Sequence, residues 1–426
     1  MNYTDHRGCA ISGATPAALE AYERALDACL SWRTGAMDHL GTAQQLAPAF
    51  TMARVLQAWL AVCSRDPRRV RSARVLLDGA AGLPANERER LHLSAIGAAL
   101  ADDYERALTL LGEVLRRYPR DVVALNVAHA FDYLVGDASG MRDRVAAVLP
   151  AWSRDLPGYH AVLAMHAFSL EECGDYDRAE DVAEAVLTLN PADARAHHVM
   201  AHVFEMTKRA EAGVRWMEAH IAGWSEGTVV ATHCWWHLAL FHLALGRFDR
   251  GLALYDQRIR AERSGEIADL IDAAALLWRV ELAGRDTGSR WIELADAWAP
   301  HIDDKYCSFS DMHAMLAFVG ARDWNRAQRL ESVLSGSRAQ PTRHGKTTRL
   351  LGLPACRALI AFGLSRYARA TLLLGGLKAL AYRLGGSHAQ RDVLRLTFRH
   401  AIERFRRGRV QHASPLEGAQ RVASTG

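Results

Sequence analysis

A short helix-turn-helix junction recurs along this chain at a fixed interval, and no other feature of the sequence constrains the fold as strongly. The junction reads DDYERA at 102–107, GDYDRA at 174–179 and GRFDRG at 246–251, so its aromatic residue returns at the evenly spaced positions 104, 176 and 248. Weaker copies lie around Gly213, Trp324 and Tyr367. The interval corresponds to two repeats of about 36 residues each, close to the tetratricopeptide period of about 34 residues.

The residues of the junction suit a turn between two packed helices. Gly174 can adopt the left-handed conformation that ends one helix, and Asp175 can cap the next. Tyr176 is expected to pack between the two helices, where Ala179 lets them approach closely. Ala, Leu, Arg and Glu dominate the chain and alternating β-branched runs are absent, which favours helix throughout.

The repeat predicts an all-α fold, a superhelical solenoid of tetratricopeptide-like helix pairs. Each pair can bury its apolar face only against its neighbours, so the pairs stack and leave a concave inner wall. We expect the first helix of each pair to line that wall. These first helices are predicted near 85–101, 121–136, 157–173, 192–207, 227–246, 266–284, 309–321 and 350–364.

Charge and composition predict three segments of the chain and exclude some classes of binding partner. We expect an N-terminal arm at 1–14, the repeat domain at 15–402, and a disordered basic tail at 403–426. The net charge is only +4 over 426 residues, which predicts no nucleic-acid partner and no polybasic membrane anchor. No apolar stretch reaches the roughly 18 residues that a membrane span needs.

The cysteines and the N-terminus indicate a cytoplasmic protein. Seven cysteines are scattered without CxxC spacing, which argues against a disulfide framework and fits a reducing compartment. The N-terminal segment, MNYTDHRGCA, lacks the basic and apolar regions of a signal peptide.

Several segments of the repeat domain resemble the tetratricopeptide repeat protein 38 family and its bacterial members. They are HVMAHVFEM at 198–206, HCWWHLAL at 233–240, Asp269 and Asp272 ahead of LWR at 277–279, DMH at 311–313 and GGSHAQRDV at 385–393. Their order and spacing are similar to that family from about residue 15 to residue 400. The resemblance implies a fold and a family, and no activity. Where relatives usually carry Asn this chain has Cys234, which puts any ligand contact of that position in doubt.

Histidines and carboxylates gather on the predicted inner wall. His198, His202 and Glu205 share one helix face, and His233 and His237 repeat the four-residue spacing one unit later. By resemblance to the tetratricopeptide repeat, these five positions face the groove. Three more groove candidates complete the predicted ligand-binding set: Asp272, His313 and Arg391.

The chemistry of this wall leaves two functions open, and the catalytic residues stay unknown in both. The first is a binding protein that holds a peptide, a protein or a small acidic ligand in its concave groove. The second is an enzyme that uses the same side chains for acid-base or metal chemistry. Imidazoles and carboxylates are good ligands for a divalent metal such as zinc, iron or manganese, and the candidate ligands are His198, His202, Glu205, His233 and His237. A structural alternative is that these histidines merely hold the helices in register.

The start of the last predicted helix also admits two interpretations. In one, Ser387 caps the helix and a pair between Arg391 and Asp392 locks it in place. In the other, this end of the chain closes over the groove and Arg391 meets an anionic group.

Overall fold

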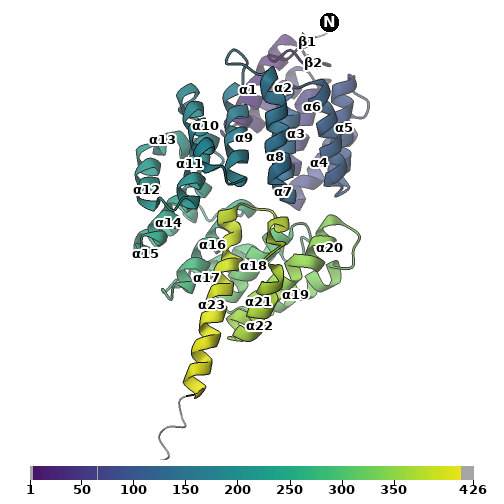
Figure 1. Cartoon of the computed structure of the whole chain (residues 1–426). Helices are drawn as coiled ribbons and strands as arrows, with labels where there is room; N and C mark the ends of the chain where they lie inside the picture. Colours follow the sequence, from purple (N-terminus) through teal and green to yellow (C-terminus); the bar gives the residue numbers. More distant parts are fainter. Residues whose placement is uncertain (1–2, 65, 414–426) are drawn as a thin grey trace, which may run out of the picture.

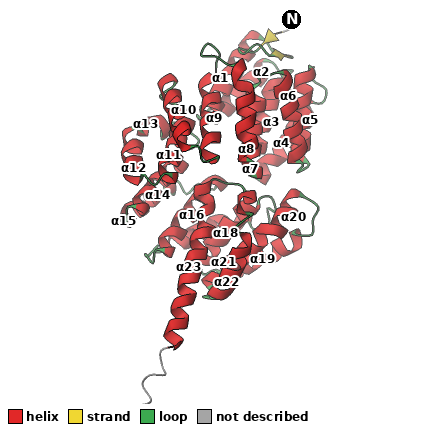
Figure 2. Cartoon of the chain, viewed as in Figure 1, coloured by secondary structure: helices red, strands yellow, loops and turns green. Residues whose placement is uncertain are grey.

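The computed structural model describes residues 3–64 and 66–413, and most of them are helical (Figure 2). The predicted all-α solenoid is confirmed. In chain order the elements are β1 (Tyr3–Thr4), β2 (Ala10–Ile11), α1 (Pro16–Leu30), α2 (Ala36–Leu46), α3 (Thr51–Cys63), α4 (Pro67–Ala80), α5 (Glu87–Leu100), α6 (Tyr104–Arg117), α7 (Val122–Val135), α8 (Ala138–Val148), η1 (Leu149–Ala151), α9 (Tyr159–Glu172), α10 (Tyr176–Leu189), α11 (Ala194–Met206), α12 (Ala210–Ala219), α13 (Ile221–Trp224), α14 (Ala231–Ala244), α15 (Phe248–Leu254), η2 (Tyr255–Ile259), α16 (Ile267–Leu282), α17 (Arg290–Trp298), η3 (Ala299–His301), α18 (Ser308–Gly320), α19 (Trp324–Ser337), α20 (Arg343–Thr347), η4 (Thr348–Gly352), α21 (Leu353–Gly363), α22 (Tyr367–Leu377), η5 (Ala381–Leu384) and α23 (His388–Ala413).

The helices pack in consecutive pairs, as the repeat predicts. Thus α5 packs on α6, α9 on α10 and α21 on α22, and each first helix also packs on the first helix of a neighbouring pair, as α9 does on α11 and α11 on α14. All of the predicted first helices are present, and their ends lie within a few residues of the expected ones. The period of the sequence therefore locates the elements that carry the candidate site.

A residue in the left-handed conformation ends the first helix at each recurring junction. Gly174 and Gly246 have φ of +83° and +72°, as predicted for glycine at this turn. Asp102 and Lys208 take the same conformation with φ of +61° each, although they carry side chains. The turn geometry is thus a property of the repeat and is imposed even where glycine is missing.

The remaining junction residues agree with the prediction in part. Ala179 is completely buried and lies at the contact between helices, and Tyr176 packs against the same apolar cluster. The prediction that Asp175 caps α10 is wrong, because its side chain makes no cap hydrogen bond and accepts from the guanidinium of Arg178 at 2.9 Å. That ion pair between neighbouring exposed side chains replaces the cap.

The solenoid bends back on itself, so that early repeats touch late ones (Figure 1). The hydroxyl groups of Tyr104 and Tyr306 lie 3.1 Å apart, and the guanidinium of Arg343 lies 4.3 Å from the centre of the Tyr104 ring. The backbone N–H of Arg343 donates to Asp102 at 2.5 Å. These contacts join the start of α6 and the turn before it to α20 and to the loop before α18.

Regular structure is present near both ends of the described part of the chain. Within the predicted N-terminal arm, residues 3–11 form a two-stranded ribbon, with Tyr3 opposite Ile11, and Arg7 binds Glu23 of α1 at 2.6 Å. At the other end α23 continues to Ala413, so the helix extends into the tail predicted at 403–426. At the start of this stretch the guanidinium of Arg404 lies 4.9 Å from the centre of the Phe362 ring, which joins α23 to α21. Residues 414–426 lie outside the described part of the chain.

The described helices include none that is both long and apolar enough to cross a lipid bilayer. All seven cysteines are free thiols.

Candidate metal centre

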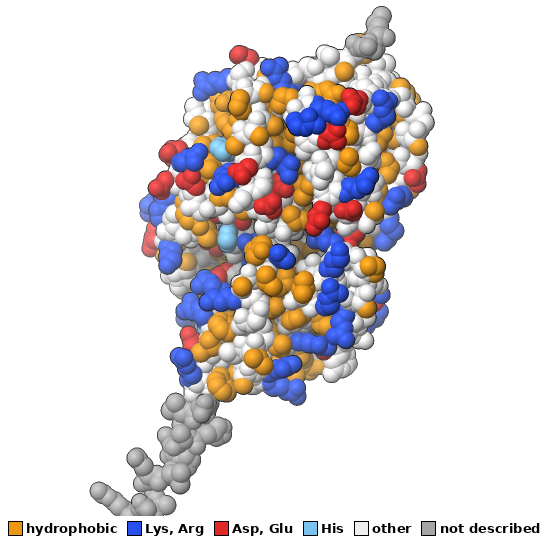
Figure 3. All heavy atoms as spheres, turned by 45° about the vertical axis from the view of Figure 1, so that its right-hand side comes forward, with side chains coloured by type: hydrophobic (Ala, Val, Ile, Leu, Met, Phe, Trp, Pro, Cys, Tyr) orange, Lys and Arg blue, Asp and Glu red, His pale blue; other side chains and the backbone are white. Residues whose placement is uncertain are grey.

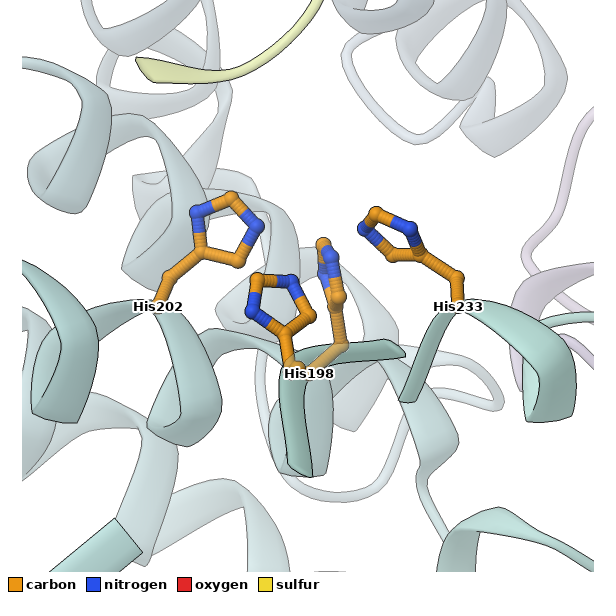
Figure 4. A group of neighbouring side chains, drawn as sticks. His198, His202 and His233 are labelled. Atoms are coloured by element: carbon orange, nitrogen blue, oxygen red, sulfur yellow. The ribbon is translucent and has the colours of Figure 1, made fainter. Parts of the chain in front are cut away.

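Two neighbouring first helices bring four histidines together in the interior of the solenoid. The four-histidine cluster consists of His198 and His202 on α11 and His233 and His237 on α14. Their ring centres are 4.4 Å apart within the α11 pair and 4.7 Å apart within the α14 pair, and those of His202 and His237 are 4.7 Å apart between the helices. Figure 4 shows the rings of His198, His202 and His233 converging from the two helices. The four-residue spacing places each pair on one helix face, and the repeat places the two faces opposite each other.

The four histidines offer a compact set of ring nitrogens that could hold a metal ion. One ring nitrogen of each histidine can be chosen so that all four atoms lie within 4.8 Å of one another. His198, His202 and His237 are buried, whereas 17% of the His233 side chain is exposed. The face shown in Figure 3 mixes basic, acidic and apolar side chains, and little histidine reaches it.

Carboxylates behind the cluster orient two of its rings. Asp272 accepts a hydrogen bond from Nδ1 of His233 at 2.7 Å, and Glu205 accepts one from Nδ1 of His237 at 2.9 Å. An ionised carboxylate can only accept, so Nδ1 carries the proton and Nε2 of each ring presents a lone pair. Metal-bound histidines usually show this arrangement, in which the second ring nitrogen donates to a carboxylate.

The other two rings have unsatisfied nitrogens. Among the described residues, neither ring nitrogen of His198 or His202 has a hydrogen-bond partner, and Nε2 of His237 also lacks one. His198 packs instead against the rings of Trp32 and Phe168, with ring centres 5.5 Å and 5.7 Å away. Buried polar atoms without a partner are rare in folded proteins, and each calls for an explanation such as a bound water, ligand or ion.

Burial keeps the imidazoles of His198, His202 and His237 neutral, which is the form that binds metal. It lowers the pKa of His202 to about 4 and the pKa values of His198 and His237 well below their usual range. Burial also raises the pKa of Glu205 to about 7. Above that pH Glu205 is ionised and can hold the His237 ring in the metal-binding tautomer.

The two predicted site carboxylates, Glu205 and Asp272, lie behind the histidine rings of the cluster. Glu205, predicted as a fifth metal ligand, lies behind His237 and supports it. Asp272 likewise supports His233, and it also accepts from the amide of Gln390 at 3.0 Å. The residues of the cluster were predicted to line an open groove, but most are buried, because Trp32 and the first turn of α23 lie against them.

His313 is not brought into the group of metal-ligating residues found among the described residues. Its Nδ1 donates to the backbone oxygen of Phe309 at 2.8 Å, and the two rings pack edge to face. His313 therefore lies outside the metal-ligating groups, and its part in a ligand-binding wall stays a prediction. Cys234 is fully buried in an apolar cluster, and burial raises the pKa of its thiol.

The contacts of the first turn of α23 bear on both interpretations made for it. Ser387 caps the helix by accepting from the backbone N–H of Gln390 at 3.2 Å. Arg391 lies 3.9 Å from the carboxyl group of Glu172, and its contact with an anionic ligand stays a prediction. The predicted pair between Arg391 and Asp392 is wrong, because Asp392 pairs with Arg395.

Two functional candidates escaped the sequence analysis. Glu171 and Glu172, the dicarboxylate pair, end α9 beside His202. A signal for them exists in the repeat, because Glu171 and Glu205 are both acidic residues at the ends of successive first helices. They are separated by one tetratricopeptide period of about 34 residues.

The fold and the site together define an all-α tetratricopeptide-like repeat protein with a buried histidine and carboxylate cluster. No family model matches the chain. Solved structures that resemble it include a human IFIT1 dimer with m7Gppp-AAAA, at 12% sequence identity and a TM-score of 0.39, covering 93% of this chain and 94% of that one. Another is the human IFIT1 dimer with PPP-AAAA, at 14% identity and a TM-score of 0.37, with the same coverage of 93% and 94%. At these values the likeness supports no inference about ligand or function.

Proposed function

We propose that this repeat protein binds a divalent transition-metal ion at the four-histidine cluster. The observation that carries the proposal is the convergence of four imidazole nitrogens within 4.8 Å of one another. In a tetrahedral zinc site the ligand atoms lie about 3.3–3.5 Å apart, because each is about 2.0–2.1 Å from the ion. Small side-chain rotations would close the cluster around an ion.

Energetics favour an occupant at this place. Leaving a buried polar atom without a partner costs about 1–3 kcal/mol. The cluster contains five ring nitrogens of this kind, on His198, His202 and His237. A metal ion bound to one nitrogen of each ring would satisfy three of these five nitrogens.

The donor set indicates the class of ion. Imidazole nitrogens suit zinc, copper, iron and nickel, while calcium and magnesium prefer oxygen ligands. Four neutral imidazoles leave the charge of the ion uncompensated, and the carboxylates of Glu205 and Asp272 lie directly behind the rings to balance it. When bound, such an ion would supply Lewis acidity. This is the chemistry on which the alternative prediction of an enzyme would depend.

Metal content of the purified chain tests the proposal. We expect a chain prepared without a polyhistidine tag and dialysed against Zn²⁺ or Co²⁺ to retain the ion stoichiometrically, and His202→Ala with His237→Ala to abolish binding at the cluster. A matched control is His197→Ala with His220→Ala, because His197 adjoins the cluster in sequence but its Nε2 donates to the backbone oxygen of Pro191 at 2.9 Å. A parent chain that retains none of these ions would overturn the proposal.

A second candidate function is binding of a small acidic ligand, which is one of the groove ligands that the sequence predicts beside a peptide or a protein. The observation that favours it is Arg195, which is buried on α11 one turn before His198. Its guanidinium lies 4.7 Å from the centre of the Trp32 ring and donates to the amide oxygen of Asn126 at 2.7 Å, and no carboxylate of the described residues forms an ion pair with it. Inorganic phosphate should then raise the melting temperature of the parent chain, and Arg195→Gln should remove that effect. No phosphate-dependent shift in the parent chain would exclude this candidate.

A further inference from the structure

The dicarboxylate pair lies directly beside the four-histidine cluster, at the end of α9. One oxygen each of Glu171 and Glu172 and one ring nitrogen of His202 all lie within 4.8 Å of one another. Oε2 of Glu171 is 3.3 Å from Nδ1 of His202. Glu171 is completely buried and Glu172 is 8% exposed, so two carboxyl groups are removed from water side by side.

These groups are poorly satisfied by the residues that surround them. Among the described residues, both oxygens of Glu171, Oε1 of Glu172 and Nδ1 of His202 have no hydrogen-bond partner. The approach of Glu171 to His202 therefore lacks hydrogen-bond geometry, although the two atoms are close. Oε2 of Glu172 lies 3.7 Å from the ring of His388 and 3.9 Å from the guanidinium of Arg391, and both distances are longer than hydrogen bonds.

The two nitrogens of the His202 ring face different surroundings. Figure 4 shows one of them directed toward the rings of His198 and His233 and the other directed away from them. Since Nδ1 lies beside Glu171, Nε2 is the nitrogen that serves the four-histidine cluster. The ring thus stands between two groups of ligand atoms.

We propose that Glu171, Glu172 and Nδ1 of His202 bind a second divalent metal ion, with the His202 ring as a bridge between the two ions. This inference rests on the proposed function, because the bridge needs an ion in the four-histidine cluster. Imidazole combined with carboxylate ligands suits zinc, iron and manganese.

The charges balance when the second ion enters. Burial raises the pKa of Glu171 to about 8 and that of Glu172 to about 7, so the empty pair retains protons near neutral pH. A dication displaces those protons, and His202 releases its ring proton when both of its nitrogens bind metal. All of these protons pass to solvent, and two carboxylates and one imidazolate then face the two dications.

The stoichiometry of binding tests this inference separately from the proposed function. Zn²⁺ is added by equilibrium dialysis and the metal content per chain is measured by inductively coupled plasma mass spectrometry. We expect two ions per parent chain and one ion per chain of Glu171→Gln with Glu172→Gln, because glutamine keeps the shape of the protonated acid and leaves the four histidines intact. Asp311→Asn is the matched control, since Asp311 is a buried carboxylate that pairs with His344 in another repeat, and it should keep two ions.

Each result has a defined meaning. A parent chain that saturates at one ion overturns the second site and leaves the proposed function standing, and a parent chain that binds none overturns both. A double variant that still binds two ions also overturns the second site. If the double variant does not fold, Glu171→Gln alone provides the same test.

Discussion

Nδ1 of His237 donates to Oε2 of Glu205 at 2.9 Å, and this contact joins two successive repeats of the solenoid. Glu205 lies at the end of α11 and His237 in the middle of α14. One repeat earlier, Glu171 at the end of α9 faces His202 on α11 at 3.3 Å. A carboxylate near the end of one first helix therefore lies beside a histidine of the next first helix, in two consecutive repeats. The four-histidine cluster forms where these two contacts are neighbours.

The helix contact at Ala179 tests the repeat register. Ala179→Leu inserts a larger side chain at a completely buried position on α10 and should lower the free energy of unfolding by about 1–3 kcal/mol. The measurement is urea denaturation followed by circular dichroism. Ala185→Leu, at an exposed position on the same helix, is the control and should change the stability little. Equal stabilities of the two variants would contradict the register.

The left-handed turns predict a stabilising substitution. Lys208 has φ of +61°, a conformation that costs a residue with a side chain about 1–2 kcal/mol and costs glycine very little. Lys208→Gly should therefore raise the free energy of unfolding by about 1 kcal/mol. Thr207→Gly, next to it at φ of −87°, should lower the stability. A loss of stability in Lys208→Gly would show that the side chain contributes more than the strain it imposes.

Substitution of Gly386 tests how closely the start of α23 packs against the interior of the protein. It has φ of +81°, and a Cβ at this position would lie 2.4 Å from the ring of Phe309. Gly386→Ala should lower the free energy of unfolding by about 1–3 kcal/mol, because the backbone is strained and the contact with Phe309 must open. Gly376→Ala, where a Cβ meets nothing within 4 Å, should be neutral or slightly stabilising. Thermal melts of both variants measure the difference.

The dicarboxylate pair predicts the pH dependence of the metal-free protein. Burial raises the pKa of Glu171 to about 8 and of Glu172 to about 7, above the value of about 4.3 for an unfolded chain. Between these values the unfolded chain has lost protons that the folded chain retains, so these groups lower the stability as the pH rises from about 4.5 to 8. Glu171→Gln with Glu172→Gln should remove this decrease. Its stability relative to the parent should thus increase between pH 5 and pH 8 in the presence of a chelator, and a constant difference would contradict the raised pKa values.

The sequence predicts the helix pairs and their stacking, because the junction recurs wherever one helix pair packs on the next. The same register predicted that His198, His202, His233 and His237 share one wall, since helical spacing and repeat period are both local properties. The same register does not bring His313 into the four-histidine cluster. The stretch of chain from Asp272 to His313 is longer than the stretch from His202 to His237, because η3 and the loop before α18 lengthen that repeat.

Contacts between segments far apart in the chain could not be predicted from the period. The first turn of α23 brings Gln390 to Asp272 across 118 residues, and Trp32 reaches His198 from the first helix pair. These two contacts bury a wall that the repeat alone would leave open. The two oxygens of Glu171 that lack a hydrogen-bond partner among the described residues are likewise seen only in the folded structure, because sequence spacing does not show which atoms are buried.

X-ray absorption spectroscopy of the chain loaded with one equivalent of zinc tests the central claim most directly. The four-histidine cluster predicts a first shell of nitrogen at about 2.0–2.1 Å, with the outer-shell scattering of imidazole rings. His202→Ala with His237→Ala should lose that signal. A first shell that contains sulfur at about 2.3 Å, or a zinc ion without imidazole scattering, would contradict the claim that these histidines form a metal centre.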